Sequence, residues 1–193
     1  MFILASASPR RRNLLAQIGA SFRVEASEAE EMREAKDAEE LVLANASIKA
    51  RAVAAHTGLP VLGADTVVAL NGRIFGKPAD EAEARAMLLA LSGCRHEVLT
   101  GVVWVKAGRE FSAVAKTHVF FAPLSEAVIA RYVATGEPLH VAGSFTVDGL
   151  GGPFIEGVTG DYHSVVGISL PLLRSMATEL GVFWPDLWDV PRR

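Results

Sequence analysis

Short apolar segments alternate with helix signals along most of this chain, and the alternation restricts the folds open to it. Strands are predicted over Phe2–Leu4 and Phe22–Val24, with a helix over Pro9–Ile18 between them. A second helix is expected from a cap at Asp37 to about His56. Strands and helices in this order predict an α/β protein.

Several later segments predict hairpins, so the sheet should be mixed. Val61–Gly63 and Val67–Leu70 are strand-like, and Asn71-Gly72 is typical of a tight turn into a strand at Arg73–Phe75. The long β-rich runs 97–106 and 110–121 are most simply a second hairpin. Further helices are predicted from the cap Asp80 to Leu91, from the cap Ser125 to Thr135, and over Pro171–Leu180. The expected fold class is therefore α/β, a mixed sheet flanked by helices.

Composition limits the class of protein further. A chain of 193 residues with 50% hydrophobic residues forms one compact domain, or one domain with two lobes. Cys94 is the only cysteine, which excludes an internal disulfide and agrees with a reducing cytosol. No apolar stretch reaches the roughly 18 residues of a membrane span, and Phe2–Ala5 is too short for the apolar region of a signal peptide. We expect a cytoplasmic protein without a membrane partner.

Charge is distributed unevenly. Residues 1–24 carry four arginines and no acid, a net of +4, although the chain as a whole has a net charge of −3. Residues 25–40 alone contain eight acidic side chains. A small basic cluster in an acidic protein favours one small anion as ligand over a nucleic acid, which needs a broad positive face.

The basic cluster follows the first predicted strand directly. Ser8 can cap the helix and Pro9 suits its first position, so the free N–H groups there can bind an anion. Arg10, Arg11 and Arg12 add full positive charge. The alternative is that the three arginines point in different directions and are solvated, which we prefer for Arg12 alone. The cluster as a whole predicts a phosphate-binding site.

Asp65 and Lys77 are candidate chemical groups further along the chain. Asp65 follows the buried strand 61–63, at a strand end where α/β proteins bind ligands, so it could hold a metal ion or activate water. The alternative is an ordinary turn or cap. Lys77 lies in the turn Gly76-Lys77-Pro78, one hairpin later. This turn lacks the glycine spacing of a Walker A loop and the Ser or Thr after the lysine, which excludes a P-loop NTPase.

Other candidates have common structural explanations. Lys49 lies on the second helix, one turn after Asn45, where a lysine is usually solvated, and Glu31 belongs to the acidic run. Segments 148–152 and 160–162 are rich in glycine, either for close approach to a ligand or for plain turns. The five histidines lack zinc-ligand spacing and no Gly-x-Ser-x-Gly motif is present, which argues against a zinc hydrolase and a serine esterase.

A series of motifs extends over nearly the whole chain. They are LASASPRRRNLL at 4–15, SEAEE at 27–31, LANASIKA at 43–50, GADTVV at 63–68, GKP at 76–78, LSGCRHEVLTGV at 91–102 and VAGSFTVDGLGGPFIEGVTGDYHSVVGISL at 141–170. In this order they resemble the Maf family of nucleotide pyrophosphatases, also called septum-formation inhibitor proteins. Each motif is weak alone, and the set is specific.

The resemblance implies one Maf-like domain over residues 1–193, with an inosine-triphosphatase-like fold of two lobes around a cleft, in a homodimer. It also implies hydrolysis of a nucleoside triphosphate to the monophosphate and pyrophosphate with Mg²⁺ or Mn²⁺, in a role that removes unwanted nucleotides. The family roles transfer onto seven residues of this chain, and Thr66 and Asp148 are further candidates for substrate binding. Catalysis falls to Asp65, Glu31 and Lys77, metal binding to Asp65 and Glu31, and substrate binding to Ser8, Arg10, Arg11, Lys49, Thr66 and Asp148.

One motif departs from the family pattern. Members that act on dTTP and UTP commonly have AG-x-Y-x-IQG, whereas this chain has Phe145 in place of the tyrosine and Asp148 in place of the glutamine. An ionised carboxylate only accepts hydrogen bonds, so base or metal recognition can differ. A pyrimidine nucleotide is the expected substrate. A 7-methyl-GTP pyrophosphatase and a non-catalytic nucleotide-binding regulator of cell division are the alternatives.

Overall fold

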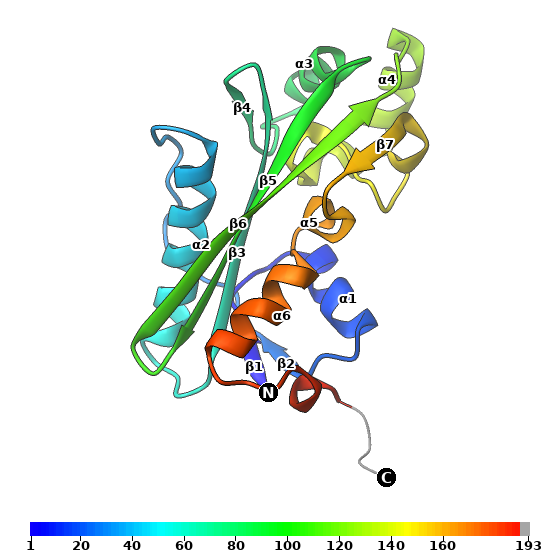
Figure 1. The fold of residues 1–193 in the computed structure, drawn as a ribbon. Helices are drawn as coiled ribbons and strands as arrows, with labels where there is room; N and C mark the ends of the chain where they lie inside the picture. Colours follow the sequence, from blue (N-terminus) through cyan, green and yellow to red (C-terminus); the bar gives the residue numbers. More distant parts are fainter. Residues whose placement is uncertain (190–193) are drawn as a thin grey trace. The chain divides into compact units, whose positions relative to one another are not determined.

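The protein has a mixed seven-stranded sheet flanked by helices, which confirms the predicted fold class (Figure 1). The structure is a computed structural model and describes residues 1–189. The strands follow the order β2-β1-β3-β5-β6-β7, and β4 pairs with β3. The pairs β1–β2 and β1–β3 are parallel, whereas β3–β4 and β6–β7 are antiparallel. The predicted cleft between two lobes stays a prediction.

Internal contacts divide the chain into two compact units. The first unit comprises Met1–Asp65, Thr100–Ala115 and the chain from Gly167 onward, and the second comprises Thr66–Leu99 and Lys116–Val166. Three strands contribute residues to both units: β3 (Val61–Leu70), β5 (Arg95–Lys106) and β6 (Arg109–Phe121).

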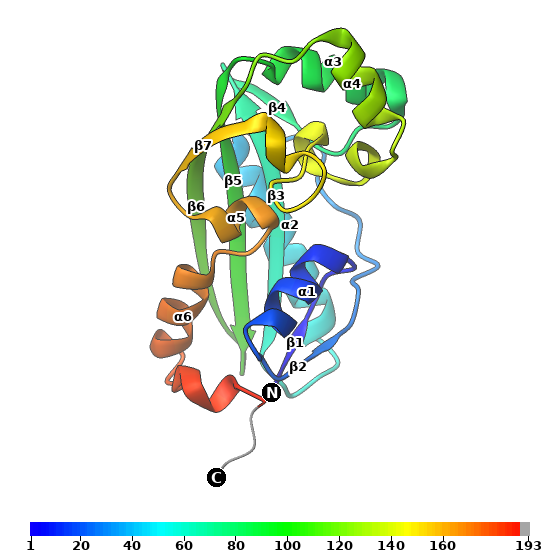
Figure 2. The ribbon, with the colours of Figure 1, turned by 90° about the vertical axis from the view of Figure 1, so that its right-hand side faces the viewer.

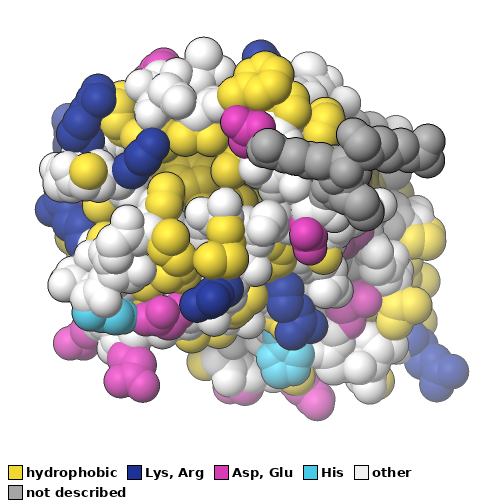
Figure 3. All heavy atoms as spheres, turned by 90° about the horizontal axis from the view of Figure 1, so that it is seen from below, with side chains coloured by type: hydrophobic (Ala, Val, Ile, Leu, Met, Phe, Trp, Pro, Cys, Tyr) yellow, Lys and Arg dark blue, Asp and Glu magenta, His cyan; other side chains and the backbone are white. Residues whose placement is uncertain are grey.

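In the first unit, helices cover both faces of the sheet. Its other elements are β1 (Phe2–Leu4), α1 (Pro9–Gln17), β2 (Phe22–Val24), α2 (Ala38–Ala54), α6 (Leu170–Glu179) and a 3₁₀ helix at Trp184–Leu187. Helix α2 covers one face, and α1 and α6 cover the other (Figures 1 and 2). Seen from below, Lys and Arg side chains are interspersed with Asp, Glu and hydrophobic ones, and neither charge dominates that face (Figure 3).

Two glycines allow α2 to pack very closely on the sheet. A Cβ atom at Gly63 of β3 would lie 2.1 Å from the Ala46 carbonyl oxygen, and one at Gly101 of β5 would lie 2.5 Å from the Val42 carbonyl oxygen. Only glycine permits this approach, since a Cβ atom at either position would overlap the helix backbone. The small residues Ala46 and Ala50 of α2 then pack into a buried apolar cluster with β1 and β3.

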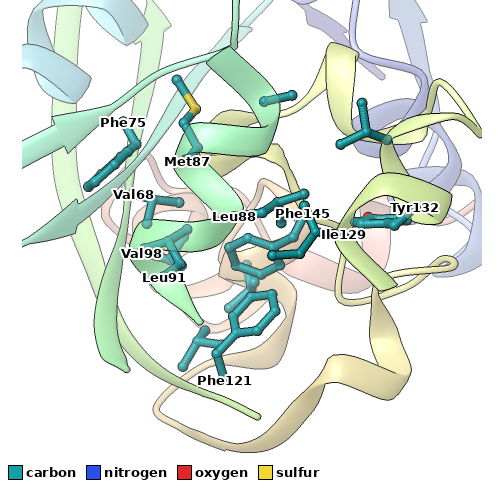
Figure 4. Close-up of a cluster of buried hydrophobic side chains, with 14 residues drawn as sticks. Val68, Phe75, Met87, Leu88, Leu91, Val98, Phe121, Ile129, Tyr132 and Phe145 are labelled. Atoms are coloured by element: carbon teal, nitrogen blue, oxygen red, sulfur yellow. The ribbon is translucent and has the colours of Figure 1, made fainter. Parts of the chain in front are cut away.

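The second unit has its own apolar core. Its elements are β4 (Arg73–Phe75), α3 (Glu81–Leu91), α4 (Glu126–Val133), β7 (Ile155–Thr159), α5 (Tyr162–Val166) and 3₁₀ helices at 137–140, 142–144 and 152–154. Figure 4 shows its buried side chains, among them Phe75, Leu88, Phe121 and Phe145. Burial of a side chain of this size stabilises the fold by about 1.5–3 kcal/mol.

The structure corrects the prediction for residues 61–70. The two predicted strands, Val61–Gly63 and Val67–Leu70, form one continuous strand β3, so Asp65 lies inside a strand and not beyond its end. A carboxylate is tolerated there because α2 supplies hydrogen-bond donors for it, Lys49 Nζ at 2.7 Å and Asn45 Nδ2 at 3.5 Å.

Candidate active site

Lys49 joins two of the predicted acidic groups. Its Nζ atom lies 2.7 Å from Asp65 Oδ1 and 2.8 Å from Glu31 Oε2. The side chains of Lys49 and Asp65 are 11% and 13% exposed, whereas that of Glu31 is 50% exposed. The ammonium group therefore lies between one nearly buried carboxylate and one that faces solvent.

The position of Lys49 follows from the way α2 packs. Leu41, Asn45 and Lys49 recur every four residues and are all buried, so they lie on the face of α2 that meets the sheet. The expectation that Lys49 is solvated, as helical lysines usually are, is therefore wrong. The close approach at Gly63 brings this face against β3, two residues before Asp65.

Asn45 is a site residue that the sequence analysis missed. Its side-chain amide donates to the Met32 carbonyl oxygen at 3.0 Å, and its Oδ1 atom accepts from the Met32 backbone N–H at 2.7 Å. Since Glu31 precedes Met32, Asn45 fixes the backbone next to that carboxylate. A polar residue one turn before Lys49, on a face otherwise composed of Leu, Ala and Val, was the signal that could have identified it.

Arg11 lies buried in the same unit. Its Nε atom donates to the Gly167 carbonyl oxygen at 2.9 Å, and Nη1 donates to Ser6 Oγ at 3.1 Å. Burial lowers the pKa of the Arg11 guanidinium, while the negative charges of Asp65 and Glu31 act in the opposite direction. Arg11 thus lies within the electrostatic reach of both carboxylates.

Ser8 caps α1 as the sequence predicted. Its Oγ atom accepts from the Arg11 backbone N–H at 3.4 Å, and Pro9 takes the first helical position. Arg10 is half-buried, and its positive charge further lowers the pKa of Arg11, whereas Arg12 is exposed. Five of the predicted charged groups thus lie in the first unit, where Lys49 contacts both carboxylates; they are Arg10, Arg11, Glu31, Lys49 and Asp65.

The remaining predicted residues belong to the second unit. Lys77 is exposed in the turn after β4, and this turn is tied to the 142–144 helix because Gly76 accepts from the Gly143 backbone N–H at 3.0 Å. Thr66 is half-buried on β3, directly after Asp65, and Asp148 is exposed. Phe145 is only 3% exposed and packs edge-on against His96 and Phe121. Its departure from the family tyrosine therefore concerns packing.

The carboxylates of Glu31 and Asp65 suit a metal ion that takes most of its ligands from water and substrate. Within residues 1–189 no group of three or more His, Cys, Asp or Glu side chains is arranged to hold a metal ion. Mg²⁺ usually binds through one or two carboxylates together with waters and substrate phosphates. Glu31 and Asp65, held by one lysine, fit that requirement.

Comparison with known proteins identifies the family. A family model described as Maf-like protein matches residues 1–180, and the chain belongs to this family. A nucleoside triphosphate pyrophosphatase from Salinispora tropica is 47% identical over 97% of this chain and 87% of that protein. A dTTP/UTP pyrophosphatase from Thermococcus gammatolerans is 44% identical over 94% and 97%, and one from Symbiobacterium thermophilum is 47% identical over 93% of each.

Among solved structures, the chain is similar to the Ham1 protein of Staphylococcus aureus. The TM-score is 0.45 at 16% sequence identity, over 63% of this chain and 71% of that one. In the part of the chain that the structure describes, every helix is too short or too polar to cross a membrane.

Proposed function

We propose that this protein is a nucleoside triphosphate pyrophosphatase, which hydrolyses a nucleoside triphosphate to the monophosphate and pyrophosphate. The observation that carries the proposal is the contact of Lys49 with both Glu31 and Asp65 beside the buried cation Arg11. Such a mixture of cations and carboxylates suits phosphoryl chemistry, where catalysis depends on positioning and charge stabilisation. Relatives at 44–47% identity are named for this activity.

In the proposed reaction, water attacks the α-phosphorus of the substrate. The new bond joins the water oxygen to that phosphorus, the bond to the β-phosphate bridging oxygen breaks, and pyrophosphate leaves. Asp65 accepts the proton of the attacking water, since it is the nearly buried carboxylate of the cluster. Arg10, Arg11, Lys49 and Lys77 bind the phosphates, together with Ser8 at the N-terminus of α1.

Glu31 and Asp65 would hold a divalent cation, Mg²⁺ or Mn²⁺. When bound, such an ion neutralises phosphate charge and acidifies a water molecule. Dialysis against EDTA should abolish pyrophosphate release, and added Mg²⁺ or Mn²⁺ should restore it. Unchanged turnover in EDTA would contradict the metal requirement.

Pyrimidine nucleotides are the proposed substrates, because two of the relatives described above are named dTTP/UTP pyrophosphatases. The purified protein should be assayed with dTTP, UTP, dCTP, dATP, dGTP and 7-methyl-GTP, with pyrophosphate release as the readout. The highest kcat/KM should be for dTTP or UTP. A preference for 7-methyl-GTP would support the alternative that the protein is a 7-methyl-GTP pyrophosphatase. Tight nucleotide binding without pyrophosphate release would support the alternative of a non-catalytic regulator of cell division.

We also propose a cytoplasmic homodimer. The single cysteine agrees with a reducing compartment. Phe183 and Trp188 near the end of the described chain are 69% and 43% exposed, and a dimer interface is where we propose that these aromatic side chains are buried. Light scattering coupled to size exclusion should give a mass of two chains, and a monomer at micromolar concentration would contradict the dimer.

A further inference from the structure

The Glu137 carboxylate accepts four hydrogen bonds within the second unit. Tyr132 Oη at 2.7 Å and Thr146 Oγ1 at 2.6 Å donate to its Oε1 atom, and so does the Gly151 backbone N–H at 3.1 Å. The Leu150 backbone N–H donates to Oε2 at 3.0 Å. One side chain thus binds both ends of segment 146–151.

Two glycines allow that segment to wrap closely around the carboxylate. A Cβ atom at Gly149 would lie 2.5 Å from Glu137 Oε2, and one at Gly151 would lie 2.6 Å from Tyr132 Oη. Both distances are too short for a contact between a real Cβ atom and an oxygen, so neither position can carry a side chain unless its neighbours move. The backbone of the segment is therefore shaped around Glu137.

Glu137 keeps its charge in this setting. Burial acts to raise its pKa, but the donors from Thr146, Leu150, Tyr132 and Gly151 outweigh burial and lower the pKa below its ordinary value. Hydrogen bonds to an ionised carboxylate are roughly twice as strong as those between neutral groups. The charge thus strengthens the bonds that fix the segment.

Asp148 lies in the middle of the same segment and is exposed. Burial raises the pKa of Tyr162, and the negative charge of Asp148 acts in the same direction. Tyr162 Oη also donates to the Val147 carbonyl oxygen at 3.4 Å. The Asp148 carboxylate is therefore carried to the surface by a turn that is held from inside by Glu137 and from outside by Tyr162.

We infer that Glu137 is a positioning residue, which sets the turn 146–151 and thereby aims the Asp148 carboxylate at the nucleoside part of the substrate. This inference depends on the function proposed above. An ionised carboxylate accepts hydrogen bonds only, which suits a base that presents an N–H group, as uracil and thymine do at N3. Glu137 itself touches no substrate and acts through Asp148.

A double-mutant cycle tests the inference. Glu137→Gln places an amide NH₂ against groups that donate, so it should loosen the turn and lower kcat/KM for the preferred nucleotide by about 10- to 100-fold, mostly through KM. Asp148→Ala should lower kcat/KM by a similar factor. In the Asp148→Ala background, Glu137→Gln should then change kcat/KM by less than about 2-fold.

Two kinetic outcomes would overturn the inference alone. Equal losses from Glu137→Gln in both backgrounds would show that it acts by a route other than Asp148, and Asp148→Ala with unchanged kcat/KM would show that there is no such route. Glu126→Gln, on an exposed residue of α4, is the matched control and should behave as wild type. A wild type that releases no pyrophosphate would overturn the proposed function together with the inference. The two kinetic outcomes above would overturn the inference and leave the proposed function in place.

Hydrogen exchange supplies a readout independent of activity. The Leu150 and Gly151 amides should exchange at least about 10-fold faster in Glu137→Gln than in wild type, while amides of α3 keep their rates. Equal exchange would contradict the inference. If Glu137→Gln does not fold, Tyr132→Phe keeps the carboxylate but removes one of its four donors, which is also the acceptor of the Thr146 backbone N–H. A smaller loss in the same direction is expected, again absent in the Asp148→Ala background.

Discussion

The side-chain amide of Asn45 binds both backbone groups of Met32, with its oxygen 2.7 Å from the nitrogen and its nitrogen 3.0 Å from the carbonyl oxygen. Met32 belongs to the segment between β2 and α2, which has little regular secondary structure and carries Glu31. Asn45 therefore couples α2 to the backbone next to Glu31, the more exposed of the two candidate metal ligands, in addition to the direct contact of Lys49 with that carboxylate.

Asn45→Ala should weaken this coupling. The substitution removes the two hydrogen bonds to the Met32 backbone and the longer one to Asp65, so we expect about 1–3 kcal/mol of lost stability. Pyrophosphate release should fall because the backbone next to Glu31 is no longer fixed and the contact with Lys49 is left to hold that carboxylate. Chemical denaturation and steady-state kinetics check both effects. Asn13→Ala, at an exposed position of α1, is the control and should change neither quantity.

Lys49→Met should affect folding and catalysis together. It leaves the nearly buried Asp65 carboxylate without its cation, and removal of one partner from a buried pair costs about 3–5 kcal/mol. The rate should fall about 10²- to 10³-fold as well, because phosphate charge loses one stabilising group. A stable Lys49→Met variant with the wild-type rate would exclude both roles of this lysine.

Lys77→Gln should separate catalysis from stability. Lys77 is exposed, so the free energy of unfolding should change by no more than about 0.5 kcal/mol. If Lys77 neutralises the leaving group, the rate falls about 10²- to 10³-fold. Lys36→Gln changes the same charge at another exposed position and serves as control. A rate equal to that of the control would remove Lys77 from the reaction.

Because His96 is buried, the protein should lose a specific part of its stability in acid. Its ring is 1% exposed between Phe121 and Phe145, and burial lowers its pKa to about 4, although the Cys94 backbone acts in the opposite direction. As pH falls from about 6.5 to 4, the unfolded state takes up a proton and the folded state does not, so stability falls by about 3 kcal/mol. His96→Leu should remove this part of the pH dependence, measured by urea denaturation at pH 7 and pH 4.5. The same change at exposed His140 should leave it in place.

Local signals predicted the elements well. Ser8, Asp37, Asp80 and Ser125 each cap a helix in the structure, and the turn at Asn71-Gly72 joins β3 to β4. These features depend on a few neighbouring residues, and the sequence displays those directly. The single strand β3 could not be predicted, since Asp65 is accommodated by α2 and not by its sequence neighbours.

The site was harder to predict because its positioning residues depend on long-range contacts. Arg11, Lys49 and Asp65 were expected near one phosphate chain, but the buried positions of Arg11 and Lys49 depend on Gly167 and on the packing of α2. Glu137 gave no signal, because in sequence it is one acid beside Pro138. Its four donors come from α4 and from residues 146–151.

Pyrophosphate release by Asp65→Asn, compared with wild type, tests the central claim most directly. The substitution keeps the size of the side chain and removes the group that would accept the proton of the attacking water. With dTTP or UTP and Mg²⁺, we expect a folded variant with a rate at least about 100-fold below wild type, while Asp80→Asn, which preserves a helix cap, keeps its rate. An Asp65→Asn variant as active as wild type would contradict the account.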